Sequence, residues 1–139
     1  MEEDPLKIWQ HVHGASSHFP IAMGLTAFII HVVPLKVLHS HRDSFVRVAV
    51  LIGALASIPA VLSGLSAYLG WFGVEPWVAN RILPHRNAAL CGSALLIILT
   101  ILQIWVKAIP KWVITLFLLA TTLAMGYAGF MGGYVSRGY

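Results

Sequence analysis

The sequence predicts an all-α, integral membrane four-helix bundle with up-down-up-down topology and a short N-terminal interfacial helix. The 139-residue chain is 58% hydrophobic and only 10% charged, with a mean hydropathy of +0.81, whereas soluble domains carry about 25% charged residues. Four apolar runs are long enough to cross a bilayer. The connections after the first and third runs are short, which makes consecutive helices antiparallel.

The chain length suits one domain, so we expect a single four-span membrane domain over residues 1–139. The spans are expected at about 19–38, 45–71, 85–106 and 112–134. Small residues recur at every fourth position in the second and fourth spans, at Ala56, Ala60 and Gly64 and at Ala124, Ala128 and Gly132. This spacing lets membrane helices approach closely, within one chain or between two.

A short segment before the first span predicts a helix lying on the membrane. Asp4 can cap such a helix, Pro5 suits its first position and Gly14 can end it. The alternative is a disordered tail. The acidic start lacks the basic region of a cleavable signal peptide, so we expect the first apolar run to stay in the membrane.

Basic residues in the loops indicate the orientation. One side of the membrane carries Lys36, Arg42, Arg47, Lys107 and Lys111, and the other carries Lys7, Arg81, Arg86 and Arg137 diluted by four acidic residues. The positive-inside rule then places both termini on the periplasmic side of a bacterial inner membrane. The net charge of +4 forms no basic stripe, so we expect lipid contact and no nucleic-acid binding.

Three of the seven histidines gather at the outer membrane face: His13 and His18 before or within the first span, and His85 at the third. Ionisable residues at a membrane edge are functional candidates. Two imidazoles from two helices of a bundle can hold haem iron by both axial positions. We expect His18 and His85 to be these metal ligands, with His13 as a substitute ligand or a partner of a propionate.

Other side chains at the same edge suit the propionates of a haem. Arg81, Arg86 and Arg137 could pair with them, and Tyr134 could donate a hydrogen bond. His31 lies about 20 Å farther along the first span and about 140° around it from His18. We therefore expect one haem b per chain rather than two, with His31 hydrogen-bonded to a neighbouring helix.

The stretch HGASSHFPIAMG, residues 13–24, resembles the motif of a bacterial membrane family catalogued as a domain of unknown function (family twenty-two thirty-one). In that family a His, a short gap and His-Phe-Pro-Ile-Ala open the first span. LSGLSAYL at 62–69, His85 and GYAGFMGGYVSRG at 126–138 resemble its later motifs in the same order. Gly14 departs from the family, which often has Pro there. The resemblance implies four membrane helices and b-type haem held by the histidines in a redox setting.

We therefore predict a membrane-embedded b-type cytochrome that transfers electrons near the outer face, as a subunit or anchor of a larger redox complex. Its partners would be other membrane or periplasmic redox subunits, with a quinol or a c-type cytochrome as further candidates. The sequence has no nucleophile elbow and no phosphate loop. Electron transfer is thus favoured over catalysis by this chain alone.

Two alternatives remain open at the level of sequence. His13, His18 and His85 could bind copper or zinc without haem, because three imidazoles suit either metal. The chain could also be a cofactor-free structural or assembly subunit that docks through its small-residue stripes.

Overall fold

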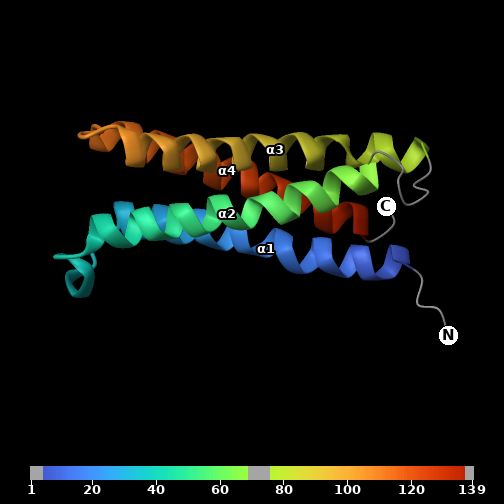
Figure 1. The fold of residues 1–139 in the computed structure, drawn as a ribbon, viewed down its shortest axis with the longest axis horizontal. Helices are drawn as coiled ribbons and strands as arrows, with labels where there is room; N and C mark the ends of the chain where they lie inside the picture. Colours follow the sequence, from blue (N-terminus) through green and yellow to red (C-terminus); the bar gives the residue numbers. More distant parts are fainter. Residues whose placement is uncertain (1–4, 69–75, 137–139) are drawn as a thin grey trace.

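The computed structural model describes residues 5–68 and 76–136, which form four long helices (Figure 1). Their bounds are Pro5–Val32 for α1, Arg42–Tyr68 for α2, Pro76–Trp105 for α3 and Lys111–Ser136 for α4, with a short 3-10 helix η1 at Lys36–Leu38. Each long helix contains a stretch long and apolar enough to cross a membrane, at His11–Val32, Arg42–Ser66, Asn80–Trp105 and Lys111–Tyr134. The predicted all-α, four-helix membrane fold is confirmed.

The helices run up, down, up and down. The α1–α2 and α3–α4 connections lie at one end of the bundle, and α1 begins and α4 finishes at the other (Figure 1). We call α1 with α2 the first hairpin and α3 with α4 the second hairpin. Helix packing is more extensive within each hairpin than between them. The bundle is thus two tightly packed hairpins joined along a looser seam.

Helix boundaries differ from the sequence-based expectation at three places. The expected interfacial helix is the first part of α1, because Gly14 keeps helical backbone and does not end the helix. α1 ends at Val32 rather than near residue 38, since the residue before Pro34 is sterically driven out of helical conformation. α3 begins at Pro76, well before residue 85, because proline is favoured in the first turn of a helix.

The bundle interior changes character along its length. At the end with the α1–α2 and α3–α4 connections the interior is aliphatic, with Val50, Leu96, Leu99 and Leu118 fully buried. Toward the end where α1 begins it holds buried serines, including Ser57 and Ser63, whose hydroxyls donate to carbonyls one turn back in α2. A histidine ring at that end therefore meets small and polar neighbours instead of leucine side chains.

Arg42 caps the C-terminal end of α1, although the sequence indicated only a basic residue in a loop. Its Nε donates to the carbonyl of Ile30 at 2.7 Å, and its Nη2 donates to the carbonyls of His31 and Val33. Pro34 has no N–H, so the Ile30 carbonyl lacks its usual helical donor. The guanidinium thus supplies the donors that the end of α1 lacks.

The variant Arg42→Gln is expected to lose about 1.5–3 kcal/mol of stability, because hydrogen bonds to charged groups contribute that much. Thermal melting of the detergent-solubilised protein measures the loss as a lower Tm. Lys36→Gln removes the same charge from an exposed position in η1 and should leave Tm nearly unchanged. Equal melting of the two variants would contradict the capping role of Arg42.

Candidate functional site

Two histidine rings lie next to each other, with perpendicular planes, across the seam between the hairpins. His13 belongs to α1 and His85 to α3. Their ring centroids lie 6.1 Å apart, with the ring planes at 89°. Both side chains are half-buried at the end of the bundle where α1 begins. We call His13 and His85 the histidine pair.

Each ring of the histidine pair is held by the other helix of its own hairpin. His13 Nδ1 lies 3.1 Å from the Ala60 carbonyl oxygen and 3.0 Å from Ser63 Oγ, while His85 Nδ1 lies 2.7 Å from the Ala128 carbonyl oxygen. A carbonyl only accepts, so each Nδ1 carries the proton and donates. Neither Nε2 has a hydrogen-bond partner among the described residues, and in this tautomer each Nε2 keeps its lone pair.

Each histidine ring packs against a glycine, which we call its seat: Gly64 for His13 and Gly132 for His85. A Cβ atom added at Gly64 would lie 2.9 Å from His13 Cε1, and one added at Gly132 would lie 3.0 Å from His85 Cε1. In both hairpins the carbonyl that accepts from Nδ1 belongs to the alanine one turn before the glycine, Ala60 or Ala128. The two hairpins therefore present their histidines in the same way.

The sequence showed the small residues at every fourth position, but only as a helix-packing pattern. In the structure the last two members of each stripe form a histidine seat, which the sequence analysis missed. The available signal was the repetition itself, because Ala-x-x-x-Gly occurs at 60–64 and again at 128–132. Both copies lie on the second helix of a hairpin, opposite a histidine near the start of the first.

The structure differs from the ligand pair expected from sequence. His18 is exposed on α1 and does not contact His85. Five residues separate His18 from His13, which turns its side chain about 140° around the helix. His13, expected only as a substitute, is the histidine that meets His85. No group of three or more His, Cys, Asp or Glu side chains gathers within residues 5–68 and 76–136, so the three-histidine arrangement is not formed there.

Arg81, Arg86 and Tyr134, three of the other predicted site residues, lie near the same end of the bundle. Arg81 and Arg86 lie within one turn of His85 on α3, and Arg86 donates to Asn87 Oδ1 at 2.9 and 3.1 Å. Tyr134 is half exposed near the end of α4. Arg137 lies outside the described residues. Arg81 and Arg86 are therefore neighbours of His85 along α3.

His31 belongs to the opposite end of the bundle. Its Nε2 donates to Thr115 Oγ1 at 2.9 Å, and the Thr115 hydroxyl donates to the Lys111 carbonyl at 2.9 Å. The expectation that His31 hydrogen-bonds a neighbouring helix is confirmed. About 27 Å of α1 separates it from His13, so it plays no part in the histidine pair.

The spacing of the pair suits one metal ion between two imidazoles. A ring nitrogen lies about 1.1 Å from the centroid of a five-membered ring with bonds of about 1.3 Å. Metal–imidazole bonds are about 2.0 Å long. Two imidazoles on opposite sides of one metal therefore have centroids about 6 Å apart, and the pair is at 6.1 Å. Nδ1–H donation to a carbonyl is also the usual way in which proteins orient a metal-binding histidine.

No protein-family model, curated protein or solved structure matches this chain. The function is therefore inferred from the geometry of the histidine pair.

Proposed function

We propose that this chain is a membrane-embedded b-type cytochrome in which His13 and His85 are the axial ligands of one haem b. The observation that carries the proposal is the paired geometry: two imidazoles with centroids 6.1 Å apart, each with Nδ1 bound to a carbonyl oxygen. Two neutral imidazoles are a strong donor set for haem iron.

The surroundings of the pair also suit a haem. Its two ligands come from different hairpins, so the group would be held at the seam, where helix packing is least extensive. The interior at this end holds buried serines and the glycines packed against the two rings, whereas leucines fill the other end. Arg81, Arg86 and Tyr134 are the candidates for binding the propionates, because they share this end of the helices. Arg137, predicted from the sequence for the same role, lies outside the described residues.

The residues of this chain would orient and tune the group rather than perform the redox step. Haem iron supplies one-electron transfer when bound. Donation from His13 Nδ1 and His85 Nδ1 to the Ala60 and Ala128 carbonyls fixes each ring and makes its Nε2 more basic. A more basic donor favours the oxidised metal, so these carbonyls would lower the midpoint potential.

The proposal extends to location and partners. Five basic residues belong to the end with the short connections: Lys36, Arg42, Arg47, Lys107 and Lys111. The positive-inside rule then puts that end in the cytoplasm and the histidine pair at the periplasmic face of a bacterial inner membrane. A quinol, a c-type cytochrome or another redox subunit could exchange electrons there. This setting is also the one that the resemblance to the four-helix family implies.

A reduced-minus-oxidised visible spectrum of the purified protein, with a pyridine extract to count haem, tests the proposal. The expected result is a sharp α band and one haem per chain. No band from cells with ample haem would overturn it. Analysis of the same sample for iron, copper and zinc then separates a haem-free metal site from a subunit without a cofactor. Two haems per chain would contradict the single centre.

A further inference from the structure

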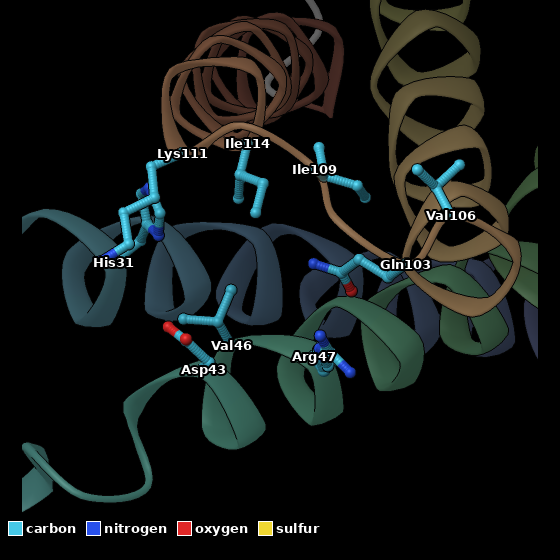
Figure 2. Close-up of a pocket in the computed structure, with 9 residues that line it drawn as sticks. All are labelled: His31, Asp43, Val46, Arg47, Gln103, Val106, Ile109, Lys111 and Ile114. Atoms are coloured by element: carbon cyan, nitrogen blue, oxygen red, sulfur yellow. The ribbon is translucent and has the colours of Figure 1, made fainter.

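A cavity lies at the end of the bundle opposite the histidine pair. It has a volume of about 110 Å³ and is lined from all four helices, with its polar lining supplied by His31, Asp43, Arg47, Gln103 and Lys111 (Figure 2). Val46 and Ile114 form apolar walls. The cavity therefore combines apolar walls with a few charged and polar side chains.

The charged groups on this cavity do not neutralise one another. Asp43 and Arg47 are four residues apart on α2, a spacing that allows an ion pair. Within the described part of the chain, however, neither Arg47 nor Lys111 lies within the 4.0 Å of Asp43 that an ion pair requires. Figure 2 shows the Asp43 carboxylate and the Arg47 guanidinium pointing apart. Both cations thus keep their donors available to a ligand.

Size and charge restrict what the cavity can hold. About 110 Å³ exceeds the roughly 10–15 Å³ that one water molecule needs and falls below the about 300–1,000 Å³ of pockets for drug-sized ligands. Two cations against one carboxylate favour an anionic group of a few heavy atoms. The planar fork of Arg47, the ammonium of Lys111 and the amide of Gln103 suit the oxygens of a phosphate.

The position of the cavity indicates where such a phosphate comes from. α3 ends at Trp105, while α2 and α4 begin at Arg42 and Lys111, so the cavity lies where the candidate spans end. In a bilayer this is the level of the lipid headgroups, and basic pockets between membrane helices bind such groups. Asp43 adds an acceptor for an N–H or O–H beside the phosphate, which phosphoethanolamine and phosphoglycerol carry and phosphocholine lacks.

We infer that this cavity binds a phosphate group bearing a neighbouring hydrogen-bond donor, supplied by a lipid headgroup or as free phosphate. Arg47 and Lys111 bind the phosphate oxygens, and Asp43 accepts from the neighbouring donor. The site is independent of the proposed haem centre at the other end of the bundle.

Native mass spectrometry of the full chain, exchanged into nanodiscs of phosphatidylcholine doped with phosphatidylethanolamine or phosphatidylglycerol, tests this site. Both dopant lipids should be retained about tenfold over phosphatidylcholine, the value of one charge-assisted hydrogen bond. Arg47→Gln with Lys111→Gln should lower retention about thirtyfold, because each cation near the surface contributes about fivefold. Asp43→Asn should remove the preference over phosphatidylcholine. Equal retention of all three lipids by the unaltered protein would overturn the inference.

Lys36→Gln with Lys107→Gln is the matched control, since it removes two charges from the same end at residues that do not line the cavity. If lipid retention falls equally in this variant, the retention comes from general charge attraction, and the inference of a binding site is wrong. Arg47→Lys keeps the charge but loses the planar fork, so it should bind more strongly than Arg47→Gln and less strongly than the unaltered protein, which separates ligand loss from misfolding. Competition by millimolar inorganic phosphate identifies free phosphate as a ligand, and no competition identifies the lipid alone. Haem content should be unchanged in every variant, so this inference and the proposed function fail separately.

Discussion

Replacing either His13 or His85 by alanine is expected to abolish the α band that the proposed haem would give and to leave almost no bound haem. In the proposed site each substitution removes one of two axial nitrogens, and one imidazole could not hold the iron from both sides. The measurement is the reduced-minus-oxidised spectrum of each purified variant, with haem counted by pyridine extraction against protein concentration.

His18→Ala is the matched control for these variants. It removes a histidine from the same helix, but from an exposed position away from the pair, so the spectrum should stay unchanged. Added imidazole should restore part of the band in His13→Ala, because it can occupy the space left by the ring. A band lost in His18→Ala and kept in His13→Ala would reverse the ligand assignment to the pair first expected from the sequence.

The variants Gly64→Ala and Gly132→Ala should each lower haem retention about tenfold or more. The added methyl group would lie 2.9 Å from His13 Cε1 or 3.0 Å from His85 Cε1, closer than van der Waals contact allows. The ring cannot turn away freely, because its Nδ1 is held by a carbonyl. Overpacking of this kind costs about 1–3 kcal/mol, and about 1.4 kcal/mol is tenfold in an equilibrium. Haem loss to apomyoglobin measures retention directly.

Gly126→Ala provides the control for the glycine variants. An added Cβ atom there meets nothing within 4 Å, although Gly126 belongs to the same helix as Gly132. This variant should retain haem and gain a little stability, since alanine favours helix by about 1 kcal/mol over glycine. If Gly126→Ala loses haem as fast as Gly132→Ala, then the effect comes from helix α4 as a whole and the histidine seat is not its cause.

Composition and hydropathy alone were sufficient for the membrane class and for four antiparallel helices. A bilayer leaves the backbone few options, because each polar group of a span must be satisfied within the span. The positions at which the helices end could not be predicted as well from the sequence. Gly14 has the residue type of a helix end but continues α1, while Pro34 ends α1 six residues before the hydrophobic run stops. Hydropathy records the extent of apolar residues, whereas backbone sterics decide where a helix ends.

The sequence also determined that histidines gather at one end of the bundle, because helices of alternating direction bring His13, His18 and His85 to the same face. Only the tertiary structure decided which two of them meet. A membrane helix is apolar on most sides, so its sequence carries little information about its rotation around its own axis. The five-residue step between His13 and His18 changes that direction by about 140°. Contacts between helices set the rotation: His13 lies against Gly64 and Ala60, and His85 lies against Gly132 and Ala128.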